Sequence, residues 1–369
     1  MGERKLNLTY EKMVLQRASM QQKPVSGTLE LLPVCNMNCD MCYIRKSKKE
    51  VDLEGGLHSA EDWIKLGKEM ARAGVLFLLL TGGEPLLFPE FQKLYLELRK
   101  LGMILTINTN GTLFDEEWAD FFAKNKPRRI NITLYGTDDT TYEKLCHYPG
   151  GFTKTMKAIQ LLRERDIDVK INGSVTRENY KDMERIYEIG EHMGVPVHMD
   201  TYMLPGIKER MLPFTKQARL LPEEAAAAEI AMLKREMTSE AFKSYVKNTV
   251  LQLERKETSY PDGISCLAGN CSFAIGWQGH MRPCVTFEAP AVSVFEKGFM
   301  AAWQEISQKS KTLKLSKACM DCSFRPVCKT CPASAYLENG SYDGTPEYLC
   351  RYSKKFIQLL QKEKGSESI

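Results

Sequence analysis

The sequence predicts an α/β fold in which a parallel sheet carries helices on its outside and is followed by a cysteine-rich segment. Two observations support this prediction. Short apolar runs alternate with amphipathic helical stretches from residue 28 to residue 204, and eight of the twelve cysteines lie between Cys266 and Cys350. The chain has 369 residues, of which 43% are hydrophobic and 27% charged, enough for two or three ordinary domains or one barrel with an attachment.

The first strand and helix units set the pattern. Thr28 to Pro33 is a short apolar run that reads as a strand. A helix is expected over Ser59–Ala73, because a Ser start is followed by Glu61 and Asp62 in the first turn and then by apolar residues at helical spacing. Val75 to Leu80 is a continuous apolar run, which is typical of a buried parallel strand.

The same alternation continues along the next hundred residues. Four further helices are expected, over Glu90–Leu101, Asp115–Lys124, Thr153–Arg165 and Tyr180–Met193. Four further strands are expected, over Met103–Asn108, Arg129–Tyr135, Ile167–Val175 and Pro196–Tyr202. About six β–α units therefore follow one another, which predicts a parallel sheet, open or closed, with its chemistry at the carboxyl ends of the strands.

The alternation stops after Leu204. Residues 216–257 are rich in Ala, Glu and Lys and predict two helices, whereas residues 262–350 hold short segments with Gly and Pro. A region with so little pattern of regular secondary structure needs bound metal to stay folded. We expect five parts: a cap (1–27), a strand–helix domain (28–205), a helical linker (206–261), a cysteine-rich domain (262–352) and a tail that begins in a short helix (353–369).

Charge and composition exclude several classes of protein. The chain has 51 basic and 47 acidic residues, and this net charge of +4 is too mild to argue for binding to nucleic acid or to a membrane surface. No apolar run approaches the roughly 18 residues of a membrane span, and the N-terminus lacks the features of a secretory signal. We therefore expect a cytoplasmic protein, in which clustered cysteines bind a metal or an iron–sulfur cluster rather than form disulfides.

The first group of cysteines comes directly after the first strand. It reads Cys35-Asn-Met-Asn-Cys39-Asp-Met-Cys42-Tyr43, a CxxxCxxC spacing. Three thiolates can bind one four-iron cluster and leave one iron without a protein ligand, open to a substrate or cofactor. The alternative is a zinc site with a remote fourth ligand, although zinc spacings are usually paired CxxC.

This spacing, followed by an aromatic residue, resembles the signature of the radical S-adenosylmethionine (SAM) superfamily. The segment Thr81-Gly82-Gly83-Glu84-Pro85, after the second strand, resembles the GGEP motif of that family, which holds the methionine amino group of SAM. Glycines let the backbone approach a ligand, and a Glu carboxylate accepts from an ammonium group. The resemblance thus implies that Gly82, Gly83, Glu84 and Pro85 bind SAM, whereas a Gly-Gly turn before Pro would by itself be only a loop.

Three weaker matches follow on later strands. Thr133 stands where the family often has a hydroxyl residue that contacts SAM, although an ordinary strand Thr is an equal alternative. Lys170, on the fifth strand, is a candidate partner for the SAM carboxylate. Asn108 to Thr112 looks like the family's TNG segment, for which the alternative is a simple Asn-Gly turn.

The second group of cysteines resembles the SPASM extension, which is found on a subset of radical SAM enzymes and binds two auxiliary 4Fe–4S clusters. Gly279 to Cys284 reads GxxxxC, Cys319 to Cys331 reads CxxCxxxxxCxxC, and Cys350 closes the set. Phe299 to Ile306 looks like the family's connecting helix. The resemblance covers residues 28–204 and 262–352 and implies a partial (β/α)6 TIM-like barrel with a C-terminal auxiliary-cluster domain.

The resemblance also implies ligands for each auxiliary cluster. One would use Cys266, Cys271, Cys284 and Cys331. The other would use Cys319, Cys322, Cys328 and Cys350. The pair Cys328–Cys331 is one residue shorter than the family's CxxxC, and two structural zinc knuckles are the alternative. Cys146 fits neither set and is expected to be a small packed hydrophobe.

The resemblance implies an enzyme, a radical SAM oxidoreductase or maturase with three 4Fe–4S clusters and SAM. In that family a flavodoxin- or ferredoxin-type reductant supplies an electron, and SAM is cleaved to a 5′-deoxyadenosyl radical that abstracts hydrogen from the substrate. Enzymes with this extension mostly modify peptides or proteins, so we expect peptide maturation such as crosslinking or epimerisation. Val285 follows Cys284, where the sulfatase-maturing branch usually has Asp.

Alternatives remain for the substrate and for the class of protein. Oxidative decarboxylation of a small molecule such as a tetrapyrrole is the second enzyme hypothesis. Met1 to Gly27 are too short for a leader-binding domain, so either a separate protein delivers a peptide or no leader is used. A non-catalytic iron–sulfur carrier would have clusters but no SAM site, and the motif from Gly82 to Pro85 argues against it.

Candidate catalytic residues lie at the end of the sixth strand. Asp200 and Tyr202 would face the mouth of the barrel, although a solvated loop edge is the more ordinary position for each. His198 would share a face with Asp200, because side chains two residues apart on a strand point the same way.

Overall fold

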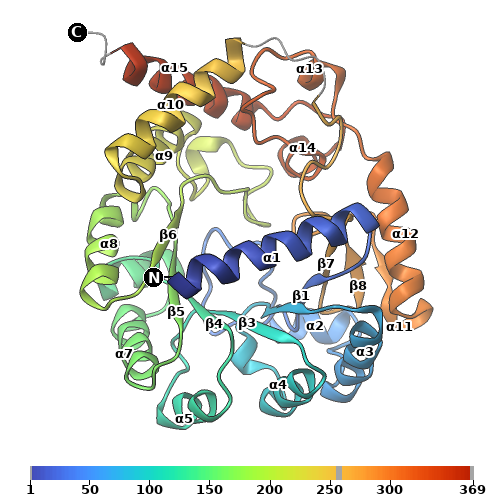
Figure 1. The fold of residues 1–369 in the computed structure, drawn as a ribbon. Coiled ribbons are helices and arrows are strands. Elements are labelled where there is room, and N and C mark those ends of the chain that lie inside the picture. Colours follow the sequence, from blue (N-terminus) through green and yellow to red (C-terminus); the bar gives the residue numbers. More distant parts are fainter. Residues whose placement is uncertain (1, 255–259, 366–369) are drawn as a thin grey trace.

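A computed structural model describes residues 2–254 and 260–365, with the side chains of the first helix described from Tyr10 onward. Among these residues, nine strands form a single sheet in the order β6-β5-β4-β3-β2-β1-β7-β8-β9. The sheet is strongly curved, and helices line its outer face (Figure 1). The predicted α/β partial barrel is confirmed.

The first six strands form the barrel, and each runs parallel to its neighbours. They are β1 (Ser26–Glu30), β2 (Phe77–Thr81), β3 (Ile104–Thr109), β4 (Arg129–Thr133), β5 (Val169–Ser174) and β6 (Val197–Asp200). The helices that connect them are α3 (Ala60–Ala73), α4 (Phe91–Lys100), α5 (Glu116–Lys124), α7 (Gly151–Glu164) and α8 (Met183–His192), the last preceded by the 3-10 turn η2 (Tyr180–Asp182). Each expected strand and helix of this part is present, with ends shifted by a few residues.

Local sequence explains where these elements begin. Ser59 caps α3 by accepting from the Asp62 N–H, while the Asp62 carboxylate accepts from the Ser59 N–H in return. In β4 the burial alternates, since Ile130 and Ile132 are buried and Asn131 is only half-buried. Asn131 donates to the Asn108 side chain of β3 at 2.7 Å. The inner face of the barrel is therefore lined in part by polar groups that can meet a ligand.

The cysteine-rich segment extends the barrel sheet, which the sequence pattern did not predict. β7 (Ser272–Ile275) pairs in parallel with β1, and the short antiparallel strands β8 (His280–Arg282) and β9 (Val292–Ser293) follow. The helices of this segment are α11 (Val294–Lys297), α12 (Phe299–Thr312), α13 (Lys317–Met320) and α14 (Pro332–Asn339). α12 joins the barrel at α3, where the Phe299 N–H donates to Glu69 at 2.8 Å.

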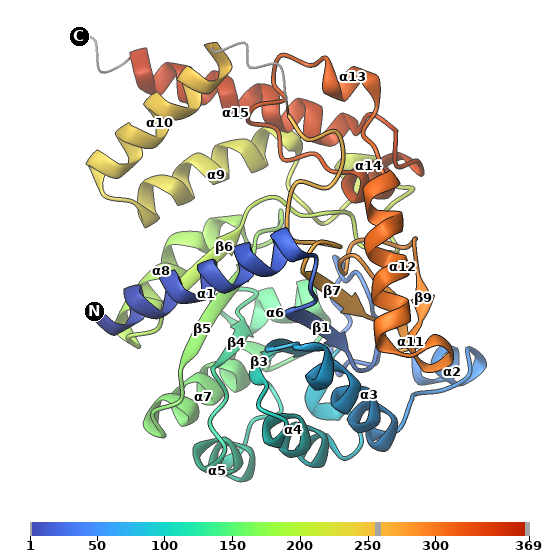
Figure 2. The ribbon, with the colours of Figure 1, turned by 45° about the vertical axis from the view of Figure 1, so that its right-hand side comes forward.

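Helices cover two ends of the molecule. The expected linker helices are α9 (Pro222–Glu236) and α10 (Ser239–Glu254), and both pack against α15 (Glu347–Gly365), which is longer than the short helix expected (Figure 2). The expected short cap is instead the long helix α1 (Gly2–Gln21), held at the amino end of β4 by an ion pair between Glu11 and Arg128.

Some short elements had no sequence prediction. They are α2 (Lys48–Leu53), α6 (Asp139–Cys146), η1 (Pro85–Leu87) and η3 (Phe214–Lys216). No helix in the described part of the chain combines the length and the apolar character needed to cross a membrane.

Candidate functional site

The glycine loop after β2 packs directly on the segment that leads into the first cysteines. The Gly83 N–H donates to the Leu32 carbonyl at 2.7 Å, and the Glu84 N–H donates to the Val34 carbonyl at 3.0 Å. A Cβ atom on Gly82 would lie 2.3 Å from the Leu32 oxygen, and one on Gly83 would lie 2.3 Å from the Val34 oxygen. Only glycine fits at both positions, and this close backbone contact fixes the loop relative to the segment that leads into the cysteines.

Glu84 is fully buried beneath this loop. Its carboxylate accepts from the Thr109 hydroxyl at 2.8 Å, the Asn110 N–H at 2.9 Å and the Leu86 N–H at 3.1 Å. Burial raises the pKa of Glu84 to about 7, against the hydrogen bonds from Asn110, Leu86 and Thr109 that lower it. The carboxylate thus ties the end of β2 to the end of β3, and a direct contact with the SAM ammonium stays a prediction.

The segment after β3 reaches the cysteine loop. The Asn110 amide donates to Asn36 at 2.9 Å and lies 3.6 Å from the Cys35 sulfur, and Asn36 donates to the Thr112 hydroxyl at 2.8 Å. This stretch resembles the TNG segment in sequence, but that resemblance alone did not predict that Asn110 and Thr112 lie in the site. These contacts connect Glu84, through Asn110, to the first cysteine.

The first three cysteines lie together in one loop, as half-buried free thiols. The Met37 N–H donates to the Cys35 sulfur at 3.4 Å, and the Arg45 N–H donates to the Cys42 sulfur at 3.3 Å. Burial raises the pKa of Cys35 to about 12, and the charges of Glu84, Cys39 and Cys42 add to this effect. Amide donors aimed at closely spaced thiols suit thiolate ligands of a metal cluster, so the residues present fit that group.

Cys146 is buried, as expected for a packed residue, and it also lies beside the cysteine loop. A hydrogen bond from its thiol is the largest cause that lowers the pKa of Cys39. The Asn38 N–H also donates to the Cys146 carbonyl at 2.9 Å. No sequence pattern indicates that this cysteine lies next to the other three, because more than a hundred residues separate them.

The eight later cysteines fall into two neighbourhoods, judged by which thiols influence one another. Burial raises the pKa of Cys350 to about 11, and the charges of Cys319, Cys328 and Cys322 add to this effect. Burial also raises the pKa of Cys284, and the charges of Cys331 and Cys266 add to this effect. The pKa of Cys271 is likewise raised by burial and by the charge of Cys266. Across the described residues, no three His, Cys, Asp or Glu are grouped as a single metal ion requires.

The two predicted strand residues lie at different depths in the barrel. Thr133 is the last residue of β4 and is level with Asn172 of β5, whereas Lys170 is level with Asn131, further from the carboxyl ends of the strands. Two residues along a strand correspond to about 7 Å. Lys170 is half-buried, and its pKa is lowered chiefly by burial. The structure thus brings Thr133, but not Lys170, to the edge that holds the cysteine loop.

A cavity of about 680 Å³ lies between the mouth of the barrel and the cysteine-rich segment. Asp200 and Tyr202 both line it. Asp200 lies 3.6 Å from His198 and raises the pKa of that imidazole, as the shared strand face predicted. The Tyr202 hydroxyl is buried without a hydrogen-bond partner, and burial holds its pKa well above the ordinary value. We call this space the mouth cavity.

The charges that line the mouth cavity are paired. Its lysine and arginines form ion pairs with carboxylates: Lys46 with Glu54, Arg210 with Glu288 and Arg282 with Glu30. Glu30 is only 1% exposed, and burial raises its pKa despite Arg282. Its second oxygen, Oε1, accepts no well-aligned hydrogen bond, although the Tyr43 hydroxyl lies close enough to lower the pKa of Glu30. Nε of Arg210 also has no hydrogen-bond partner. The cavity therefore offers an unused acceptor and unused donors but no unpaired lysine or arginine from the described residues.

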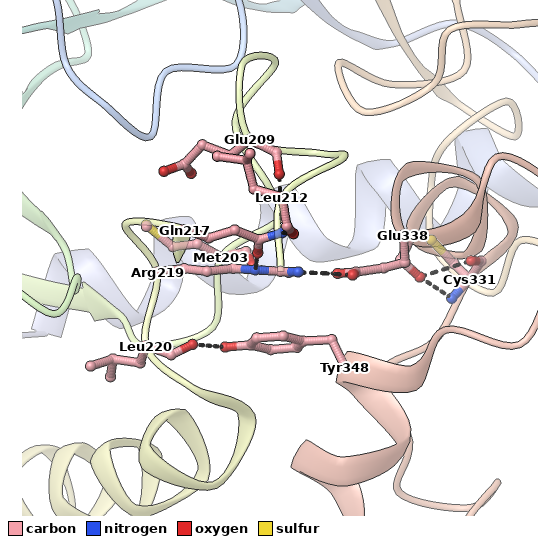
Figure 3. A network of polar contacts seen from close by, with 10 residues as sticks. Met203, Glu209, Leu212, Gln217, Arg219, Leu220, Cys331, Glu338 and Tyr348 are labelled. Carbon is pink, nitrogen blue, oxygen red and sulfur yellow. Dashed lines mark hydrogen bonds and ion pairs between the residues drawn. The ribbon is translucent and has the colours of Figure 1, made fainter. Parts of the chain in front are cut away.

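Residues 203–219, here called the bridging loop, connect β6 to the helical part and are fastened at their end (Figure 3). Arg219 donates from Nη2 to Glu338 at 2.8 Å and from Nε to Gln217 at 2.6 Å, and its guanidinium lies 3.8 Å from the Tyr348 ring centroid. Glu338 belongs to α14, which begins directly after Cys331. The loop is thus tied to the cysteine-rich segment by a buried ion pair.

Comparison with known proteins defines the class of the molecule. Residues 29–189 match the family model of the radical SAM superfamily. The AdoMet-dependent heme synthase of Methanosarcina barkeri is 23% identical over 358 residues, which cover 91% of this chain and 99% of that protein. The sporulation killing factor maturation protein SkfB of Bacillus subtilis is 23% identical over 305 residues, 81% of this chain and 68% of that protein.

Solved structures share the fold over most of the chain. SuiB of Streptococcus suis bound to its precursor peptide SuiA has a TM-score of 0.66 at 16% identity, covering 94% of this chain and 80% of that one. Native anSMEcpe with bound AdoMet has a TM-score of 0.67 at 19% identity, covering 92% of this chain and 98% of that one. Residues 29–189 are therefore a radical SAM domain, and the fold of these solved structures extends over most of the chain. The C-terminal, cysteine-rich segment lies within the part that shares this fold, and its SPASM type remains what the sequence resemblance implies.

Proposed function

We propose that this enzyme removes a hydrogen atom from a peptide or protein substrate held in the mouth cavity, in a maturation reaction such as crosslinking or epimerisation. The observation that carries this proposal is the charge balance of the cavity. Lys46, Arg210 and Arg282 each have a carboxylate partner. A tetrapyrrole substrate carries several carboxylates, which favour unpaired cations as partners. A peptide backbone is neutral and needs only donors and acceptors.

The unused polar atoms of the cavity suit a peptide group. Oε1 of Glu30 can accept from an N–H, while the Tyr202 hydroxyl and Nε of Arg210 can donate to a carbonyl. Buried polar atoms without partners are costly, so a ligand that satisfies them gains affinity. Asp200 lies on the same wall and remains our candidate for a proton acceptor.

The residues that would hold the cofactors form part of the proposal. Cys35, Cys39 and Cys42 would hold the cluster with the open iron, and the loop from Gly82 to Pro85 would hold SAM, with Thr133 nearer to it than Lys170. When bound, this cluster and SAM supply the one-electron chemistry that removes hydrogen from the substrate. We propose two auxiliary 4Fe–4S clusters, three in total, on the two neighbourhoods of later cysteines, and a flavodoxin- or ferredoxin-type reductant.

A second candidate function is the oxidative decarboxylation of a tetrapyrrole. The M. barkeri heme synthase matches nearly the whole of this chain, whereas the match to SkfB leaves about a third of that protein uncovered. This coverage favours the tetrapyrrole hypothesis, and the cavity's paired charges favour the peptide hypothesis.

The test uses the full chain, reconstituted with iron and sulfide without oxygen, reduced with dithionite and supplied with SAM. We expect 5′-deoxyadenosine from the native protein and none from a Cys35→Ala, Cys39→Ala, Cys42→Ala variant. Peptides encoded beside the gene and iron-coproporphyrin III are then offered separately, and products are followed by mass spectrometry. A modified peptide with unchanged porphyrin supports the proposal. A decarboxylated porphyrin overturns the peptide assignment, and the absence of 5′-deoxyadenosine overturns the function as a whole.

A further inference from the structure

We propose that the outer face of the bridging loop, beside Cys39, is the docking surface for a small acidic one-electron carrier protein. The surface consists of Arg177, Lys208, Lys216 and the loop tip at Met211 and Leu212. The proposal rests on the proposed function, because it takes the first cluster to be held by Cys35, Cys39 and Cys42.

Position is the first argument. A cavity of about 490 Å³ opens on this face, and Cys39 lines it together with residues of the bridging loop, whereas neither Cys35 nor Cys42 does. Of the three proposed ligands, Cys39 thus lies at the wall of a cavity that opens to the outside. Electron transfer weakens steeply with distance, so a carrier delivers its electron fastest where a ligand of the cluster comes nearest to the surface.

The bridging loop lies directly on the cysteine loop. The Ile207 N–H donates to the Cys42 carbonyl at 3.2 Å, and the Lys208 ammonium donates to the Asn38 side chain at 3.3 Å. A Cβ atom on Gly206 would lie 2.9 Å from the carbonyl carbon of Met41. A protein that binds the outside of the bridging loop therefore rests one backbone layer away from the proposed cluster ligands.

Charge is the second argument. Arg177, Lys208 and Lys216 are exposed, and within residues 2–254 and 260–365 none of them has a carboxylate partner. The fourth cation at this cavity, Lys144, pairs with Glu178 at 3.2 Å. Three cations without carboxylate partners on one small face attract an acidic surface and speed its encounter.

The carboxylates at the same cavity do not cancel these cations. Asp40 pairs with His147 at 2.7 Å. Glu209 is buried, accepts from the Ala218 N–H at 2.6 Å and has its pKa raised by burial. The hydrogen bond to His147 leaves the charge of Asp40 in place, but Arg177, Lys208 and Lys216 outnumber this one exposed carboxylate, so the face keeps an excess of positive charge.

The shape of the loop tip is the third argument. Met211 is 94% exposed, and Leu212 is also exposed, so apolar side chains lie on the surface among the cations. Exposed apolar groups with a charged surround are typical of a protein interaction site. Complexes for electron transfer are small and weak, so a few exposed apolar side chains among cations suffice for one.

The experiment uses a bacterial flavodoxin as the probe and the cluster-loaded full chain. SAM cleavage is driven either by reduced flavodoxin or by dithionite, which needs no docking site. For Lys208→Glu with Lys216→Glu we expect flavodoxin affinity by calorimetry, and the flavodoxin-driven rate, to fall by about tenfold or more at low salt. The dithionite-driven rate should stay the same. A second variant, Met211→Asp, alters only the exposed tip and should also weaken flavodoxin binding.

Lys65→Glu with Lys247→Glu is the matched control. It makes the same charge change at exposed lysines on α3 and α10 and should leave flavodoxin binding unchanged. The proposal is overturned if both surface variants keep native flavodoxin affinity, or if the dithionite-driven rate falls as much as the flavodoxin-driven rate. Loss of substrate modification with dithionite present would assign the face to substrate delivery and also overturn it. If the native protein makes no 5′-deoxyadenosine with either reductant, the proposed function fails, while the binding data still decide on docking.

Discussion

Replacing Glu338 by Gln removes one charge of the buried ion pair that fastens the bridging loop (Figure 3). The side chains of Arg219 and Glu338 are 1% and 3% exposed, so water cannot compensate the remaining guanidinium. Breaking a buried pair on one side costs about 3–5 kcal/mol. Arg219 keeps its bonds to Gln217 and to the Met203 carbonyl at 3.1 Å. We therefore expect the free energy of unfolding to fall by about 3 kcal/mol, the lower end of that range.

The measurement is urea unfolding of the cluster-loaded protein without oxygen. Glu223→Gln is the control, because it breaks the Arg351 pair at 2.9 Å, whose side chains are 41% and 44% exposed. An exposed pair is worth about 0–1 kcal/mol. The double variant Arg219→Met with Glu338→Leu should recover most of the loss, because no unpaired charge stays buried. If Glu338→Gln costs no more than Glu223→Gln, the reasoning from burial is refuted.

Three further outcomes follow from the same structure. Because burial raises the pKa of Glu84 to about 7, its contribution to stability is fully present below pH 4.5 and is lost as the pH rises to 7. Thermal melts across this range should show a smaller pH dependence for Glu84→Gln. Iron analysis should give about twelve irons per loaded chain, falling to about eight when the first three cysteines become Ala, and zinc instead of iron would contradict the clusters. Replacing Cys319 and Cys322 should spare 5′-deoxyadenosine formation but abolish product, and a folded variant with full product would limit that cluster to a structural role.

The alternation of strands and helices could be predicted because its signals are local, whereas the partial barrel followed from the family resemblance. A capped helix such as α3 and an apolar strand such as β2 can each be recognised from about fifteen consecutive residues. The strand order, which was not predicted from the sequence, agrees with the rule that successive β–α units lie side by side. The long helix α1 was not predicted, because residues 1–27 are mostly polar and indicated only a short cap.

The features of the site also divide into those that were predictable from the sequence and those that were not. The motifs around Cys35 and Glu84 were visible as spacings, and the structure brings both motifs together at one end of the barrel. Contacts that join distant residues were not visible. Cys146 reaches Cys39, and Asn110 reaches Cys35, across stretches of sequence that carry no periodic signal. Only the three-dimensional arrangement shows such neighbours.

The pairing of β7 with β1 shows why the mouth cavity could not be derived from either half of the chain. This pairing brings Arg282, on the next strand, to Glu30 at the end of β1, some 250 residues earlier. Arg282 thereby neutralises a carboxylate that burial would otherwise make costly at neutral pH, while Glu30 keeps one oxygen free for a ligand. Each residue alone would be a buried, unpaired charge. The barrel and the cysteine-rich segment therefore depend on each other for the cavity, and a truncated barrel would lose the Arg282 partner of Glu30 and the wall that the cysteine-rich segment gives the cavity.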